Sequence, residues 1–185
     1  MRRTWILTFT VVLAFGIAAP VARADGDIVP RYSRVAAAIA GWPVPVRCWN
    51  EQQNWNANFN PGVVGIYSPR FGEIELAPQV CFALAAAANV KPRGPDNKLL
   101  LAEAVQTLAH ESEHAHGIRN ERPADCYGMQ QVEFVATNLG LGRRYGRGLA
   151  RLFWVYVYNA PGYIYSSPKC YEGGPWDLYE RSVWP

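Results

Sequence analysis

The sequence has no hydrophobic run of the roughly 20 residues that a membrane-spanning helix needs. Its most apolar stretch, residues 5–19, follows the basic pair Arg2 and Arg3. About fifteen residues at 1.5 Å each fall short of a bilayer core of ~30 Å, which argues against a stable membrane anchor. A basic start, a short apolar core and small residues around Ala24 are instead typical of a secretory signal peptide.

An excess of charge of one sign is also missing once that segment is set aside. Cleavage near Ala24 removes three arginines and no acid, so Lys and Arg fall from 18 to 15 against an unchanged 15 Asp and Glu. A mature chain without net charge has no electrostatic basis for binding nucleic acid. We therefore expect a signal peptide over residues 1–24 and one secreted domain, extracellular or periplasmic, over residues 25–185. The one basic group left is more typical of a solvated helix face: Arg143, Arg144, Arg147 and Arg151.

Cysteine is scarce, and no two cysteines have the C-x-x-C spacing that is typical of zinc bound by thiolates. In an exported protein, cysteines pair by default. Four cysteines allow three pairings. We predict two disulfides, one in each half of the chain: Cys48 with Cys81, and Cys126 with Cys170.

Internal repeats and low-complexity tracts are absent, whereas seven Trp, ten Tyr and seven Phe supply material for one core. Helical periodicity predicts the longest helix over residues 98–116, with Leu101, Val105, Leu108 and Ser112 in one stripe. Asp96 or Asn97 is expected to cap it. Further helices are predicted over residues 31–40, 79–89 and 121–139, and residues 145–158 are either helical or extended.

Strands are predicted mainly in the first half of the chain. Residues 63–67 and 73–76 flank the turn sequence SPRFG and predict a hairpin. Residues 50–62 are polar and rich in Asn, so we expect a loop there. Helices and strands grouped in this way indicate an α+β fold class.

Histidine is the scarcest of the chemically active residues: the chain has three, all within residues 110–116. His110 and His114 are four apart on the predicted helix, so both side chains leave the same face and can bind one metal ion. Glu111 lies between them in the sequence HESEH. This H-E-x-x-H arrangement is suited to a zinc site in which the glutamate is a base and not a ligand.

A catalytic zinc ion takes a third protein ligand and keeps one open position. Gly117 allows the chain to reverse, after which Glu121 and Asp125 lie one turn apart on the next helix. Either carboxylate can be the third ligand, and the other can accept the second ring N–H of a ligand histidine. His116 is the least favoured candidate.

The sequence HESEH followed by NERPAD resembles the zincin metallopeptidases, and most closely the gluzincin branch with its downstream N-E-x-x-(A/S)-D helix. The resemblance covers about sixteen residues. It implies Zn²⁺ held by His110, His114 and Glu121, with Glu111 as general base and Asp125 as partner of a ligand histidine. The six residues between His114 and Glu121 are fewer than gluzincins usually have.

The resemblance implies a compact zincin-like domain over residues 25–185, with helix 98–116 under a small sheet and helix 121–139 beside it. It also implies a secreted zinc metallopeptidase acting on a peptide or protein substrate. Residues 72–77 are a candidate for the edge strand that binds substrate, although a plain core hairpin is equally expected. Three tyrosines are available to stabilise an oxyanion: Tyr127, Tyr163 and Tyr165.

Three alternatives stay open from the sequence. The histidines can belong to the polar face of an amphipathic helix, the domain can bind a partner without catalysis, or a metallohydrolase can act on a small molecule. The oligomeric state is also open.

Overall fold

The structure is a computed structural model that describes residues 26–179 and Trp184. The predicted signal peptide, residues 1–24, lies outside the described residues. Within the described part, no helix combines the length and apolar character that a membrane span requires.

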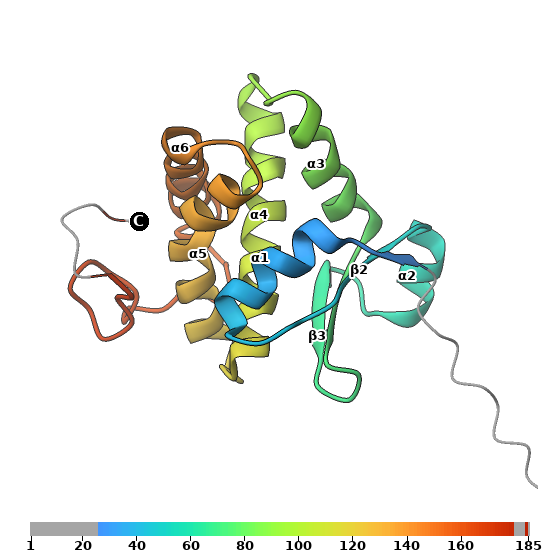
Figure 1. Ribbon diagram of the computed structural model, residues 1–185. Coiled ribbons are helices and arrows are strands. Elements are labelled where there is room, and N and C mark those ends of the chain that lie inside the picture. The colour runs from blue at the N-terminus through green and yellow to red at the C-terminus, as the bar shows by residue number, and fades with distance from the viewer. Residues whose placement is uncertain (1–25, 180–183, 185) are drawn as a thin grey trace, which may run out of the picture.

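The described residues form a mixed α+β fold, which confirms the predicted fold class (Figure 1). In chain order, the elements are β1 (Gly26–Ile28), α1 (Pro30–Ala40), β2 (Val46–Trp49), α2 (Gln52–Asn58), β3 (Gly65–Ser68), β4 (Glu73–Leu76), α3 (Pro78–Asn89), α4 (Pro95–His116), α5 (Glu121–Asn138), α6 (Arg143–Phe153) and the π-helix η1 (Trp154–Tyr158).

Helix α4 is the centre of the molecule. It contacts α1, α3, α5, α6 and the strands β3 and β4, and Figure 1 shows it between α5 on one side and α3 on the other. The predicted apolar stripe is buried, because Leu101, Val105, Leu108 and Ser112 are each at most 1% exposed. The predicted arrangement, with this helix under the sheet and the next helix beside it, is therefore observed.

The start of α4 differs from the prediction. The helix begins at Pro95, with Gly94 at the cap position and no side-chain capping bond, so capping by Asp96 or Asn97 is wrong. Proline is favoured in the first turn because its fixed φ matches the helix and its missing N–H needs no partner there.

The sheet has the strand order β1-β2-β4-β3. Strands β3 and β4 form the predicted antiparallel hairpin, and β4 also pairs in parallel with β2. Of the two expectations for residues 72–77, the core hairpin is confirmed and the edge strand is wrong, because β4 is interior and its Ile74 and Leu76 are fully buried. The strand at the edge beside the site is β3.

The predicted loop over residues 50–62 contains the short helix α2. Trp55 explains this difference, since its side chain is 1% exposed and packs against Trp49 and Phe59. Its indole N–H donates to the carbonyl of Val63 at 2.8 Å. Burial of one aromatic residue thus overrides the polar composition of the segment.

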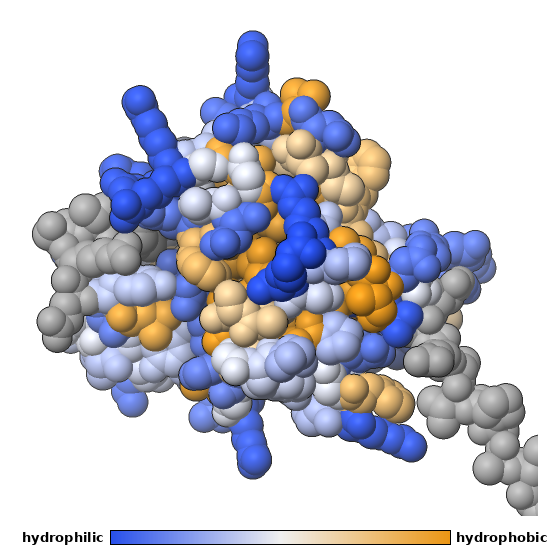
Figure 2. Space-filling view, viewed as in Figure 1, coloured by the Kyte–Doolittle hydropathy of each residue, from blue (hydrophilic) through white to orange (hydrophobic). Residues whose placement is uncertain are grey.

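Residues 145–158 are helical, as α6 followed by η1. The basic group on α6 is a solvated face, as expected: Arg143 and Arg147 pair with Glu133 at 2.5 and 2.9 Å, and the side chains of Arg144 and Arg151 are exposed. In the view of Figure 2, hydrophilic side chains project from several sides of the molecule, and hydrophobic surface lies in separate patches.

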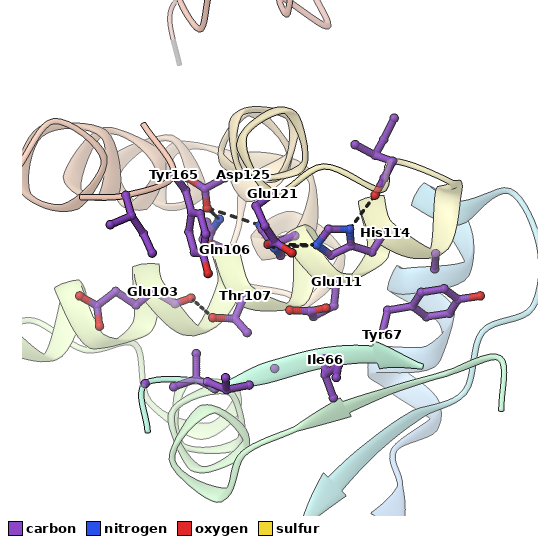
Figure 3. Close-up of a pocket in the computed structure, with 18 of the residues that line it drawn as sticks. Ile66, Tyr67, Glu103, Gln106, Thr107, Glu111, His114, Glu121, Asp125 and Tyr165 are labelled. Atoms are coloured by element: carbon purple, nitrogen blue, oxygen red, sulfur yellow. Dashed lines mark hydrogen bonds and ion pairs between the residues drawn. The ribbon is translucent and has the colours of Figure 1, made fainter. Parts of the chain in front are cut away.

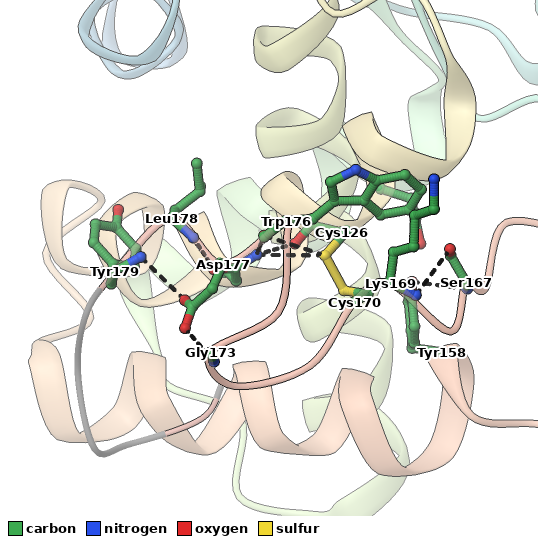
Figure 4. The surroundings of a disulfide bond; sticks show 12 residues. Cys126, Tyr158, Ser167, Lys169, Cys170, Gly173, Trp176, Asp177, Leu178 and Tyr179 are labelled. Atoms are coloured by element: carbon green, nitrogen blue, oxygen red, sulfur yellow. Dashed lines mark hydrogen bonds between the residues drawn. A yellow bond between two sulfur atoms is a disulfide. The ribbon is translucent and has the colours of Figure 1, made fainter.

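Both predicted disulfides are present, Cys48–Cys81 and Cys126–Cys170. The second fastens the C-terminal segment to α5 (Figure 4). Beside it, the Gln130 side chain donates to the carbonyl of Trp176 at 2.7 Å and accepts from the N–H of Leu178 at 2.8 Å. These bonds hold residues 159–179 against α5, although the segment has little regular secondary structure.

Candidate metal centre

Three side chains from the end of α4 and the start of α5 converge on one point (Figure 3). His110 Nε2 and His114 Nε2 are 3.0 Å apart, and Glu121 Oε2 lies 3.1 Å from the first and 3.4 Å from the second. Gly117 makes this possible, because its φ of 111° ends α4 and turns the chain back toward α5.

These separations fit three ligands of one metal ion. Ligand atoms about 2.1 Å from a tetrahedral ion lie about 3.4 Å from each other. Two imidazole nitrogens and one carboxylate oxygen are a donor set that suits zinc. No other group of this kind occurs among the described residues.

A hydrogen bond at His114 Nδ1 and a nearby carboxylate at His110 Nδ1 leave both Nε2 atoms facing the convergence point. His114 Nδ1 donates to the carbonyl of Ile118 at 2.6 Å. His110 Nδ1 lies 3.4 Å from Asp125 Oδ1. When Nδ1 carries the proton, Nε2 has its lone pair free for a metal, so these contacts select the tautomer that a ligand needs.

Asp125 lies behind His110 and not among the converging atoms. It is 1% exposed, and its Oδ1 accepts from Gln106 Nε2 at 2.6 Å and from the Tyr163 hydroxyl at 3.0 Å. Burial together with the Asp125 charge raises the pKa of Tyr163, so the phenol stays a donor. Asp125 is therefore held beside His110, and Glu121 is the carboxylate that lies among the converging atoms.

The electrostatics of His110 reflect the same carboxylates. Burial alone lowers the pKa of this histidine, but hydrogen bonding with Asp125 and Glu121 outweighs it and raises the pKa to about 10. Without a metal ion, the His110 ring holds an additional proton, and its positive charge offsets the negative charge of these carboxylates. A bound metal ion would offset the same negative charge and displace the proton.

Glu111 lies alongside the three converging groups without joining them. It is 6% exposed, and its carboxylate accepts from the backbone N–H of Tyr67 on β3. Burial raises the pKa of Glu111, while the nearby histidines lower it. A desolvated carboxylate with a raised pKa is a better proton acceptor than an exposed one, which suits a general base.

The site opens into a cleft with a volume of about 940 Å³. Strand β3 forms one wall, α4 forms the floor, and Tyr163, Ile164 and Tyr165 line the opposite side. Gly65 allows β3 to lie close to α4, because a Cβ there would be 2.7 Å from Thr107 Cγ2 and 3.0 Å from Glu111 Cγ.

The remaining candidates differ in their positions relative to the cleft. His116 Nδ1 is 3.2 Å from the carbonyl of Ala40, away from the converging atoms. Of the three tyrosines, Tyr163 is bonded to Asp125, and Tyr127 does not line the cleft. The ring of Tyr165 lies 6.1 Å from that of His110 and lines the cleft.

Sequence reasoning missed several groups that position the site. No sequence pattern indicates the carbonyl of Ile118, because every residue supplies a backbone carbonyl. Gly128 could have been found, since a glycine inside a helix lowers helix stability by about 1 kcal/mol relative to alanine and often marks a close contact.

Comparison with models of known protein families, with curated proteins and with solved structures gives no match for this chain. The functional argument therefore depends on the chemistry and geometry of the site itself.

Replacing Gly128 by alanine should weaken both the fold and the metal site. A Cβ at this position would be 2.9 Å from the backbone N and Cα of His110, so α5 must move away from α4. We expect a loss of about 1–3 kcal/mol in unfolding free energy from this overpacking. We also expect zinc affinity to fall by about tenfold or more, because α5 carries Glu121 and Asp125. Denaturant unfolding and competition with a zinc-binding dye measure the two effects.

Gly148→Ala is the matched control, because no atom lies within 4 Å of a Cβ at that position of α6. It should raise stability by about 0.4–1 kcal/mol and leave zinc affinity unchanged. Equal effects of the two substitutions would contradict the close approach of α5 to His110.

The two disulfides should differ in their effect on the metal site and not in their effect on stability. Their loops span 33 and 44 residues, so replacing either cysteine pair with serine should lower the unfolding free energy by about 2–4 kcal/mol. Only loss of Cys126–Cys170 should also weaken zinc binding, because Cys126 follows Asp125 on α5. Zinc titration of the two double variants, under conditions where both are folded, measures this difference. Equal zinc affinities would contradict it.

Proposed function

We propose that this protein is a secreted zinc-dependent metallopeptidase that hydrolyses peptide bonds. One observation carries the proposal: His110 Nε2, His114 Nε2 and Glu121 Oε2 lie within 3.4 Å of one another beside the buried carboxylate of Glu111. Two histidines and one carboxylate are one of the ligand sets of catalytic zinc ions, and they leave the fourth coordination position open for water or substrate.

The residues around the site have separate tasks in this reaction. His110, His114 and Glu121 would hold the zinc ion, which when bound would polarise the substrate carbonyl and lower the pKa of the attacking water to about 7. Glu111 accepts the proton of that water and later donates it to the leaving amine. Asp125 keeps the ring of His110 in place.

Tyr165 is the tyrosine best suited to stabilise the developing oxyanion. In Figure 3, its side chain points into the cleft toward α4. Burial, together with the charges of Glu121, Asp125 and Glu111, raises the pKa of Tyr165. The phenol therefore stays protonated and donates a hydrogen bond to a negative oxygen.

Two features favour a peptide over a small molecule as substrate. Strand β3 is at the edge of the described sheet and lines the cleft, so an extended peptide can pair with it. The cleft also continues on both sides of the histidines, from Glu103 on α4 to Arg119 in the turn that follows α4. The two disulfides are consistent with an oxidising compartment, which supports secretion.

Metal removal tests the proposal. The protein from residue 25 onward, loaded with zinc, should cleave a mixture of quenched fluorescent peptides. Activity should be lost after treatment with a chelator and should return with about one equivalent of zinc per chain. Failure to cleave any peptide or unfolded protein would overturn the proposal, as would cleavage that the chelator does not affect.

A further inference from the structure

Glu103 belongs to a row of side chains that face the cleft from α4. Glu103, Thr107 and Glu111 are spaced four residues apart, so they share one face of the helix, and all three line the cleft. Figure 3 shows Glu103 at the end of this row opposite to His114. The mechanism proposed above assigns a role to Glu111 and none to Glu103.

The carboxylate of Glu103 is partly buried without a partner. Among the described residues, no donor or cation binds it; only its backbone carbonyl accepts, from the Thr107 hydroxyl at 2.9 Å. Burial accordingly raises the pKa of Glu103. Other acids in the cleft have protein partners. Glu111 accepts from the backbone N–H of Tyr67, Glu121 contacts the two histidines, and Asp125 accepts from the Gln106 side chain. Glu103 is therefore desolvated, and no partner among residues 26–179 compensates for it.

The two ends of the cleft carry opposite charge. Arg119 lies beyond His114, and it is the only lysine or arginine among the described residues that line the cleft. Among the described residues, therefore, no basic side chain that lines the cleft competes for Glu103 at the other end. A cation that enters with the substrate meets a carboxylate in partly desolvated surroundings, where the attraction is stronger than in water.

We infer that Glu103 selects substrates that carry a lysine or arginine side chain on one side of the scissile bond. The inference rests on the proposed peptidase function. Glu103 and Glu111 are eight residues apart, which is about 12 Å along the helix axis. An extended peptide advances about 3.3 Å per residue, so the selected residue is two to four positions from the scissile bond.

A peptide scan tests this inference. Starting from a cleaved sequence, each of the four positions on either side of the bond is changed in turn to Lys, Gln or Glu, and kcat/KM is measured. We expect Lys to exceed Gln by roughly tenfold to a hundredfold at one position on one side only. Glu at that position should be the poorest residue.

Two variants assign this preference to Glu103. Glu103→Gln should remove the preference, so that the Lys and Gln peptides are cleaved with similar kcat/KM, and Glu103→Lys should favour Glu instead. Glu51→Gln is the control, because it makes the same change of charge at an exposed residue that does not line the cleft. It should keep the preference for Lys.

The outcomes separate the two proposals. Cleavage without a preference for Lys or Arg overturns the role of Glu103 and leaves the peptidase proposal intact. A preference that survives in Glu103→Gln has the same consequence. If no peptide is cleaved by the zinc-loaded protein, the peptidase proposal itself is overturned, and the role of Glu103 is overturned with it.

Discussion

Replacing Glu111 by glutamine should lower kcat for peptide hydrolysis by about a hundredfold to ten-thousandfold. The amide has nearly the shape of the carboxylate, and its oxygen still accepts from the N–H of Tyr67, but it cannot take a proton from water. Zinc binding should be unchanged, because Glu111 is not among the converging ligand atoms. Steady-state kinetics and metal content, measured on the same preparation, test both parts.

Glu113→Gln is the matched control for this experiment. Glu113 is also on α4 and is 3% exposed, but its carboxylate accepts from Gln131 on α5 at 3.4 Å and does not line the cleft. Burial raises the pKa of Glu113, so a neutral amide is well tolerated there. This variant should keep its activity. Hydrolysis that survives in Glu111→Gln with the zinc in place would exclude Glu111 as the base.

The second large effect is expected at the third ligand. Glu121→Ala removes one of the three converging atoms, so we expect zinc affinity to fall by more than about a hundredfold. Asp125→Asn should cost about 10–100-fold, because Asp125 acts through His110 and does not contact the ion. The order of the two effects, measured by competition with a chelator of known affinity, distinguishes the ligand from its partner.

His116→Ala is the control for the ligand assignment. His116 belongs to the same histidine cluster in the sequence, but its ring faces the carbonyl of Ala40. Zinc affinity should therefore be unchanged in this variant. Zinc retained by Glu121→Ala and lost by Asp125→Ala would move the third ligand to Asp125.

Local patterns predicted much of the fold. The period of α4 and the hairpin of β3 and β4 follow from spacing and residue type over short distances. The pairing of cysteines within each half of the chain, one of three possible pairings, is also confirmed. The convergence of His110 and His114 follows from helix geometry, since residues four apart face the same side. Gly117 explains why a carboxylate of the next helix can return to the histidines, but the choice of Glu121 over Asp125 came from the resemblance of HESEH and NERPAD to the gluzincins.

The features that the sequence did not predict depend on contacts between distant segments. Whether β4 is an edge strand is decided by its pairing with β2, and the helix at Trp55 is decided by packing on Trp49 and Phe59. The role of Gly65 also depends on a distant segment, because the missing side chain allows β3 to lie close to Glu111 on α4. Periodicity within one segment carries no information about which other segment packs against it.

The metal content of the protein from residue 25 onward tests the central claim most directly. Elemental mass spectrometry should find about one zinc ion per chain, and almost none in His110→Ala, because three protein ligands hold the ion. If the protein binds no metal even after incubation with zinc, the enzyme account fails. The histidines would then be a polar helix surface on a disulfide-bonded fold.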